Sequence, residues 1–240
     1  MNLIIKHAKI KCLHLLRQPS YVVSTLIFPS LFFLFFAAPN AKTPEAANLL
    51  MGSFAAFAVL GVVFFQFALD FSIERATPWF QFVKTLSIPS WQFFLARSLT
   101  ALFFALLAAS AVLGVVLLTT PATLSWQRFF PFLFALFIGA LPFCLLGLIV
   151  GYFAPSSSAL PISNLVYLIL SFAGGLWIPP AGLAPTIQKI SVWLPTRFYG
   201  EWVWSAALGR QTEMKFLAGL LIYSAFAAPI VWTGHRRSLQ

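Results

Sequence analysis

The side chains suited to acid–base, nucleophilic or metal chemistry are few and scattered in this sequence. His7, His14 and His235 each stand without a nearby carboxylate, so they form a poor metal-binding set. The serine run at 156–158 has no histidine or aspartate close by to act as a base. Neither a Gly-x-x-x-x-Gly-Lys-[Ser/Thr] motif nor a His-Glu-x-x-His motif is present. The sequence therefore predicts no catalytic site, no metal site and no cofactor bound by this chain.

A few polar and aromatic side chains inside apolar stretches are candidates for contact with a transported molecule. Asn164 and Tyr167 are three residues apart and would share one helix face, and Gln66 has a comparable setting upstream. These side chains either face a substrate or form hydrogen bonds between helices, as polar groups in apolar surroundings commonly do. Phe57 and Phe64 belong to a large set of 28 phenylalanines, which either face lipid or line an apolar cavity.

The composition requires a hydrocarbon environment. Of the 240 residues, 60% are hydrophobic and only 8% are charged, and the mean hydropathy is +0.91. Soluble domains carry about 25% charged residues. The net charge of +10 is spread along the chain and forms no basic stripe, so it favours contact with lipid headgroups and gives no indication of nucleic acid binding.

Six apolar stretches are long enough to cross a membrane, and none contains Asp, Glu, Lys or Arg, each of which costs roughly 3 kcal/mol at mid-membrane. We therefore predict an all-α membrane protein with one domain over residues 1–240, and a kink at Pro29 and at Pro142. The predicted spans are 21–38, 50–69, 98–118, 129–153, 160–178 and 216–233.

Six spans place both termini on one side, and the distribution of Lys and Arg favours the cytoplasm. The localisation predicted is the cell (inner) membrane. The segment 1–18 predicts an amphipathic helix lying in the membrane interface. Its apolar stripe would contain Ile4, Ile5, Ala8, Cys12, Leu15 and Leu16.

Two further segments outside the spans are informative. Asp70–Arg97 is the largest predicted cytoplasmic loop, and a short helix over Thr77–Leu86 is expected because Pro suits a first helical position. On the other side, Pro179–Lys215 contains apolar stretches too short to span a membrane. This outer segment predicts either two short helices or a re-entrant hairpin before the last span.

The source of energy is open at this point. The spans contain no carboxylate, whereas ion-coupled carriers often use ionisable groups at mid-membrane. This favours a separate energy source over the alternatives, an ion-gradient-driven carrier or a membrane-embedded enzyme acting alone.

The layout resembles the permease subunit of ABC-2 type ABC transporters along nearly the whole chain. An N-terminal segment leads into the first span through Leu16-Arg17-Gln18-Pro19. After the second span, Glu74-Arg75 precedes Phe82-Val83-Lys84, which is similar to the cytoplasmic coupling segment of that family. Gly174-Gly175-Leu176-Trp177-Ile178-Pro179 followed by Leu194-Pro195-Thr196 resembles the outer segment of the family. One departure is Ala76-Thr77-Pro78-Trp79, where many members place a glycine.

The resemblance implies an ATP-driven exporter subunit that is not itself an enzyme. It would pair with a second permease copy, as a homodimer or as a heterodimer, and bind a separate ABC ATPase that holds ATP and Mg. The substrate would be hydrophobic or amphiphilic, such as a drug or a lipid. The residues implied for ATPase coupling are Glu74, Arg75, Thr77, Pro78, Trp79, Phe80 and Lys84. The residues implied for an outer gate are Trp177, Pro179, Pro195 and Glu201.

Overall fold

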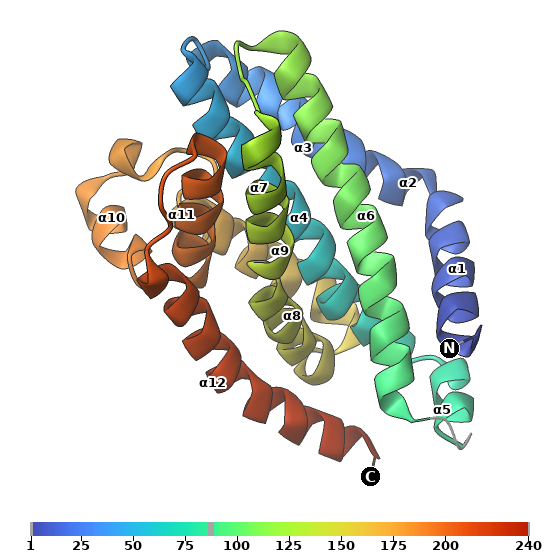
Figure 1. Cartoon of the computed structure of the whole chain (residues 1–240). Helices are drawn as coiled ribbons and strands as arrows, with labels where there is room; N and C mark the ends of the chain where they lie inside the picture. The colour runs from blue at the N-terminus through green and yellow to red at the C-terminus, as the bar shows by residue number, and fades with distance from the viewer. Residues whose placement is uncertain (1, 86–88, 240) are drawn as a thin grey trace.

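The protein is a bundle of helices packed around one long central helix (Figure 1). The computed structural model describes residues 2–85 and 89–239, and for residues 2, 83, 84, 90 and 239 it describes the backbone only. Every regular element in these residues is helical, as the sequence predicts. Both ends of the described chain lie at the same end of the bundle, here called the terminal end, and the opposite end is the distal end.

Six segments are long and apolar enough to cross a membrane, in agreement with the predicted number. The observed segments are Pro19–Asn40, Pro44–Arg75, Trp91–Thr119, Trp126–Phe153, Ser156–Ala173 and Met214–Ser238. The fifth ends earlier than predicted, because the chain turns at Gly174-Gly175 and Gly175 adopts a positive φ of 86°. The others begin earlier or end later than their apolar cores, since a helix continues through polar residues at the membrane surface.

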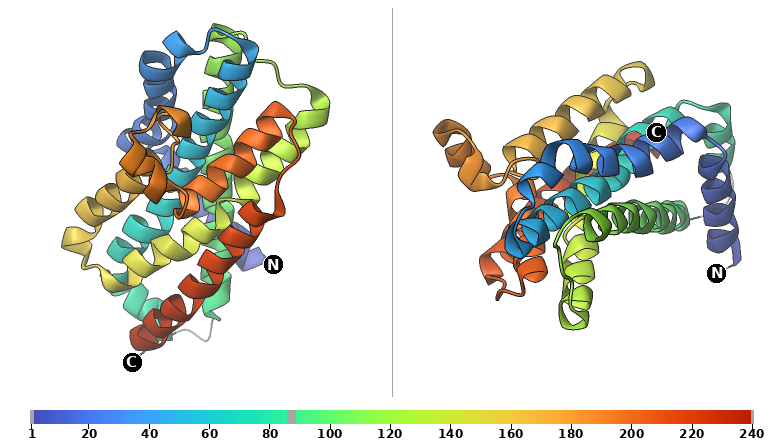
Figure 2. Two further views of the ribbon diagram at one scale, coloured as in Figure 1. Left: turned by 90° about the vertical axis from the view of Figure 1, so that its left-hand side faces the viewer. Right: turned by 90° about the horizontal axis from the view of Figure 1, so that it is seen from above.

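Helix α4 (Pro44–Arg75) is the central element. It packs against α6 (Ser90–Thr119), α8 (Leu141–Phe153) and α9 (Ser156–Ala173). Its most apolar window is 83% buried, whereas that of α12 (Met214–Leu239) is 11% buried. A helix that is apolar on every side is expected in such a central position, and here the neighbouring spans surround it (Figure 2).

The loop predicted over Asp70–Arg97 is shorter in the structure, because both of its ends belong to long helices. Residues 70–75 continue α4, and Arg97 lies in the second turn of α6. Only α5 (Pro78–Thr85) and the short connections around it interrupt the two long helices. Within this region Glu74 pairs with Arg97, which joins the end of α4 to the beginning of α6.

The first span contains two widened turns. Short α-helices α2 (Pro19–Val22) and α3 (Phe28–Phe32) alternate with π-helical turns η1 (Val23–Ile27) and η2 (Phe33–Ala37), and η3 (Ala38–Asn40) closes the span. Proline removes one backbone donor and π-turns accommodate such irregularities. The irregularity predicted at Pro29 is thus present as π-helical turns on either side of α3.

The fourth span is divided into α7 (Trp126–Ile138) and α8, with a turn at Gly139-Ala140. Pro142 occupies the first turn of α8, where the missing N–H costs no helical hydrogen bond. A Cβ on Gly139 would lie 2.6 Å from Cδ2 of Tyr199. Glycine at this position therefore lets the ring of Tyr199 approach the break.

The outer segment folds into short helices, one of the two alternatives predicted. η4 (Pro180–Gly182) and α10 (Pro185–Ser191) project on one side of the bundle, whereas α11 (Pro195–Leu208) packs between α4, α7 and α12 (Figure 2). Two buried hydrogen bonds hold α11: Trp204 Nε1 donates to Ser53 Oγ at 2.7 Å, and Tyr199 Oη donates to the Leu136 carbonyl at 2.7 Å.

The N-terminal segment is a helix, α1 (Asn2–Leu16), that lies along α6. Ile4 and Ala8 pack with Ala96 in a small buried cluster, whereas Ile5 and Leu16 of the predicted stripe are exposed. The apolar stripe is therefore divided between α6 and the outside. The location of α1 in the membrane interface stays a prediction.

A Gly-x-x-x-Gly pair at Gly147 and Gly151 brings α8 against the backbone of α4. Cβ atoms at these positions would lie 2.8 Å from the Phe64 carbonyl oxygen and 2.5 Å from the Phe67 carbonyl oxygen. Small residues at this spacing allow close helix approach in membranes. The sequence analysis overlooked this pair, although the spacing is readable in the sequence.

We expect Gly151→Ala to destabilise the protein because its methyl group meets backbone that cannot move aside, at a cost of about 1–3 kcal/mol. Gly114→Ala in α6 is the matched control, since nothing lies within 4 Å of its Cβ position. Thermal unfolding of the purified protein in detergent measures the difference. Equal unfolding temperatures for the two variants would contradict the close packing of α4 and α8.

Candidate functional site

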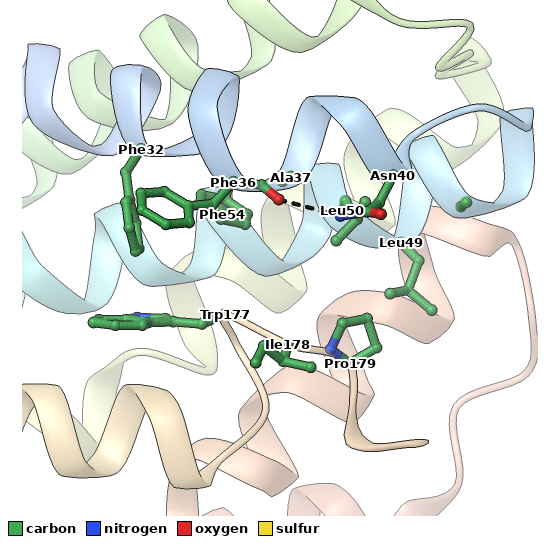
Figure 3. A pocket seen from close by; sticks show the side chains of 11 residues that line it. Phe32, Phe36, Ala37, Asn40, Leu49, Leu50, Phe54, Trp177, Ile178 and Pro179 are labelled. Carbon is green, nitrogen blue, oxygen red and sulfur yellow. Dashed lines mark hydrogen bonds between the residues drawn. The ribbon is translucent and has the colours of Figure 1, made fainter. Parts of the chain in front are cut away.

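An aromatic cavity of about 830 Å³ opens near the distal end of the bundle (Figure 3). It lies between the first span, the beginning of α4 and the segment that follows α9. The lining residues are Phe32, Phe36, Ala37, Asn40, Ala46, Leu49, Leu50, Phe54, Trp177, Ile178 and Pro179. None of them is charged, so the cavity suits an apolar or aromatic molecule.

Phe32 is the centre of the aromatic wall. Its ring centroid is 4.5 Å from that of Phe36, 4.8 Å from that of Trp177 and 5.7 Å from that of Phe54. Rings at such separations attract one another beyond their burial. Phe32 and Phe36 come from neighbouring turns of the first span, and the widened turn η2 contains Phe36. The irregular helix of the first span thus turns these rings toward α4.

Polar atoms are sparse at the cavity. Asn40 Nδ2 donates to the Phe36 carbonyl at 3.3 Å, the dashed line in Figure 3. The indole N–H of Trp177 is buried and has no acceptor among the described residues. A buried donor without an acceptor costs free energy. A change in the position of Trp177 that exposed its N–H to the cavity would relieve that cost.

Of the four residues predicted for an outer gate, Trp177 and Pro179 line this cavity. The other two, Pro195 and Glu201, lie outside its lining. Pro195 is buried at the start of α11. Glu201 forms an ion pair with Arg197 at 2.5 Å within α11. The family resemblance grouped all four because they lie in or directly before the predicted outer segment Pro179–Lys215.

The candidate pathway residues are mostly structural contacts between helices. Tyr167 Oη donates to the Phe57 carbonyl at 3.1 Å, and Gln66 Nε2 donates to Tyr21 Oη at 2.9 Å. The sequence left two interpretations open for these side chains, contact with a substrate or hydrogen bonds between helices. The bonds observed match the second. Phe57 is buried beneath the cavity, with its ring centroid 5.8 Å from that of Trp177.

Two other candidates are separated from the cavity. Phe64 is buried in the α4–α8 contact. Asn164 is exposed on α9. The cavity residues that the sequence analysis missed are Phe32, Phe36 and Phe54, since nothing in the spacing of 28 phenylalanines distinguishes these three.

At the terminal end, a partly buried charge cluster joins three elements. Glu74 at the end of α4 accepts a hydrogen bond from Lys11 Nζ of α1 at 2.7 Å and another from the Arg97 guanidinium of α6. Arg97 is 5% exposed. Its second terminal nitrogen donates to the Gln66 carbonyl at 2.7 Å. One carboxylate therefore ties α1 and α6 to the central helix.

Burial shapes the electrostatics of this cluster. It lowers the pKa of the Lys11 amine, Arg97 lowers that pKa further, and the Glu74 carboxylate opposes both. Asp70 lies one turn before Glu74, and its Oδ2 is buried without a partner among the described residues. Two acidic and two basic side chains thus face one another, and removal of any one would leave a buried charge uncompensated.

Arg75 points away from this cluster. Its guanidinium donates to the Ala154 carbonyl at 3.1 Å, and Ser72 Oγ donates to the same carbonyl at 2.9 Å. Ala154 is the residue that ends α8. Glu74 and Arg75, adjacent in sequence, therefore fasten α4 to different neighbours.

Helix α5 carries the exposed part of the predicted coupling segment. Thr77 caps it, since its Oγ1 accepts from the Phe80 backbone N–H at 3.3 Å, and Pro78 is its first residue. Trp79 is 57% exposed and Phe82 is 53% exposed, with their ring centroids 5.6 Å apart.

Two coupling candidates differ from that pair. The ring of Phe80 turns inward, where it contacts Phe71 of α4 at 5.9 Å between centroids. The side chain of Lys84 lies outside the described part of the chain.

Comparison with known proteins gives a consistent result. Residues 8–208 match the family model described as ABC-2 type transporter. A protein of Bacillus subtilis (strain 168), YvfS, whose name describes it as a transport permease, is 27% identical over 229 residues, which are 93% of either chain. No solved structure matches the chain significantly.

We expect Glu74→Gln to lower stability strongly, by about 3 kcal/mol, because the half-buried Lys11 and the buried Arg97 would both lose the carboxylate that accepts their hydrogen bonds, and Asp70 alone would remain to oppose two positive charges. Glu45→Gln is the control: Glu45 pairs with Arg210 at 2.5 Å, but both side chains are more than 60% exposed. Such a surface pair contributes about 0–1 kcal/mol. Urea denaturation in detergent measures the free energy of unfolding of both variants. An equal decrease in the two would refute the stabilising role of the charge cluster.

Proposed function

The chain belongs to the ABC-2 type transporter family, and on that premise we propose that it forms the export pathway for a hydrophobic or amphiphilic substrate in an ATP-driven transporter. As a member of this family it is a transmembrane permease subunit of an ABC transporter, and an ABC ATPase is its implied partner. The observation that carries the proposal is an uncharged aromatic cavity in a chain that matches this family along most of its length.

The motor is proposed to be a separate subunit. The sequence contains no phosphate-binding loop of the Gly-x-x-x-x-Gly-Lys-[Ser/Thr] type. Movement of an apolar cargo against a gradient requires energy, and the ATPase would supply it by binding one state of the permease more tightly than another. The ATP and Mg belong to that partner.

Helix α5 is the proposed docking element. Trp79 and Phe82 present two large adjacent rings to the outside, and aromatic side chains often dominate binding energy at interfaces. Phe80 anchors the same helix to α4 through Phe71. A displacement of α5 by the ATPase would thus be passed to α4.

Glu74 and Arg75 are proposed to transmit movement between helices and not to contact the ATPase directly. Glu74 joins α1, α4 and α6, and Arg75 joins α4 to the end of α8. These bonds would make the terminal ends of several spans move together. We therefore assign both residues to transmission of the movement and α5 to contact with the ATPase.

The aromatic cavity is proposed to form the outer part of the substrate path. Because the cavity lies between the first span, α4 and the segment after α9, movement of these elements would change its opening. Trp177 and Pro179 would act as its outer gate. A second permease copy, in a homodimer or a heterodimer, would complete the path, and the terminal end would face the cytoplasm in accordance with the distribution of Lys and Arg.

Reconstitution tests the proposal. The chain is placed in liposomes with ABC ATPase subunits from the same genome, and efflux of a panel of fluorescent amphiphiles is measured with and without ATP. We expect efflux that requires both the ATPase and ATP. Efflux driven by an ion gradient from the chain alone would instead support a self-powered carrier.

We expect Trp79→Ala combined with Phe82→Ala to weaken ATPase binding at least about tenfold, since each ring is an exposed anchor. Trp193→Ala in the outer segment is the control, because Trp193 is also exposed and directly follows α10, which lies far from α5 (Figure 1). Binding of the purified ATPase to the permease in nanodiscs is measured. Unaltered affinity in the double variant would place the docking surface elsewhere.

We expect Ala46→Trp to reduce efflux several-fold because the indole would occupy the cavity that Ala46 lines. Ala111→Trp adds the same bulk at a half-buried alanine of α6 that does not line it. Efflux and ATP hydrolysis are measured in the same liposomes. If both variants transport equally well, the cavity is not on the substrate path.

A further inference from the structure

A second apolar groove lies in the terminal half of the bundle, between α6, α8 and α12. Two hollows of about 460 Å³ and 320 Å³ share Phe94, Leu145 and Leu148, so they form one continuous groove. Its other residues include Trp91, Leu141, Ala228, Val231 and Trp232. It is separate from the aromatic cavity and shares no residue with it.

The dimensions of the groove match one acyl chain. The lining runs from Leu141 to Tyr152 on α8 and from Ser224 to His235 on α12. Twelve residues of helix extend about 16 Å, which is close to half of the roughly 30 Å hydrocarbon thickness of a bilayer. The groove therefore extends from the terminal end to about the middle of the membrane, the depth of a single leaflet.

The chemistry of the deep end suits a hydrocarbon chain. Ser98 and Ser224 are the polar side chains there, and both hydroxyls are bonded within their own helices, to the carbonyls of Phe94 and Leu220. They demand no polar ligand. Inside the membrane an acyl chain in this groove exchanges one apolar environment for another, so it gains packing contacts with the lining, and preference for one lipid must come from the headgroup.

The mouth of the groove is basic. Arg236 holds its guanidinium over the ring of Trp232, 5.1 Å from the centroid, and Trp232 itself lines the groove. Arg237 follows it, and both are exposed at the end of α12. Among the described residues no carboxylate forms an ion pair with either one. Arg75 lies at the same mouth, bound to the Ala154 carbonyl two residues after Tyr152.

An apolar groove of leaflet depth with guanidinium groups at its mouth has the features that an anionic phospholipid would recognise. We propose that this groove binds one phospholipid with an anionic headgroup, with an acyl chain between α8 and α12 and the phosphate against Arg236 and Arg237. Such a lipid would join α12, which has little buried surface, to the rest of the bundle. It is a resident of the protein and is distinct from the transported molecule.

The test uses the full chain purified in detergent, with phosphatidylglycerol and phosphatidylcholine of identical acyl chains as probes. Native mass spectrometry measures the affinity of each lipid. We expect one phosphatidylglycerol to bind at least about tenfold more tightly than phosphatidylcholine, because basic residues near a membrane surface each favour anionic lipid. Arg236→Gln with Arg237→Gln should abolish this preference. Lys6→Gln with Lys9→Gln removes two exposed charges from α1 at the same end and should leave it intact.

Tryptophan substitutions that fill the groove test whether the acyl chain lies in it. Ala228→Trp should remove binding of the first lipid, whereas Ala225→Trp, on the same helix but outside the lining, should not. Both alanines are exposed, so neither indole has to enter the packed core. Circular dichroism and size-exclusion chromatography check that each variant folds. If a tryptophan variant fails to fold, the arginine variants test the lipid preference, because they alter only exposed side chains.

Three results would overturn the proposal: equal affinity for the two lipids in the unaltered chain, equal loss of preference in the lysine and arginine variants, or retention of the lipid in Ala228→Trp. Dissociation of a dimer by Ala228→Trp, with no effect of lipid, would show that a second copy of the chain occupies the groove instead. None of these outcomes depends on ATP-driven efflux. The lipid proposal and the proposed transport function can therefore fail independently of each other.

Discussion

The structure depends on one constraint, the pairing of a half-buried carboxylate with two cations where the central helix leaves the apolar bundle. Glu74 accepts hydrogen bonds from Lys11 and Arg97, which belong to elements far apart in sequence. A charge in this position is tolerable only with its partners present. The three elements that supply the charges are therefore held in one arrangement, and in the proposed mechanism a displacement of α5 would move them together.

This constraint separates two tasks that lie close together in the sequence. The exposed rings of Trp79 and Phe82 are available to another protein, whereas Glu74 and Arg75 are occupied within the chain. The distal half has a different character, with an uncharged aromatic cavity between the first span, the beginning of α4 and the segment that follows α9. The close glycine contact holds α8 against the backbone of α4 at Phe64 and Phe67, between the cavity and the charge cluster along the central helix.

The number and type of the spans were predictable from the sequence because the absence of charge over about 20 residues is a strong local signal. Stretches too short to span predicted either short helices or a re-entrant hairpin in the outer segment, and the structure has short helices. The buried cluster was not predictable, since Lys11 and Glu74 are 63 residues apart and no local pattern records their pairing. The cavity was equally hidden: Phe32 and Phe54 differ from other phenylalanines only in the direction that the π-helical turns and α4 give them.

The most direct test of this account compares docking with transport in one variant. Glu74→Gln is assembled with the ATPase in liposomes that stabilise the fold, and ATPase affinity and ATP-driven efflux are measured together. The account predicts nearly unchanged affinity, because α5 remains exposed, and a large loss of efflux, because α4 no longer moves with α1 and α6. Loss of affinity with unchanged efflux per bound ATPase would show that Glu74 is a docking residue and would contradict the account.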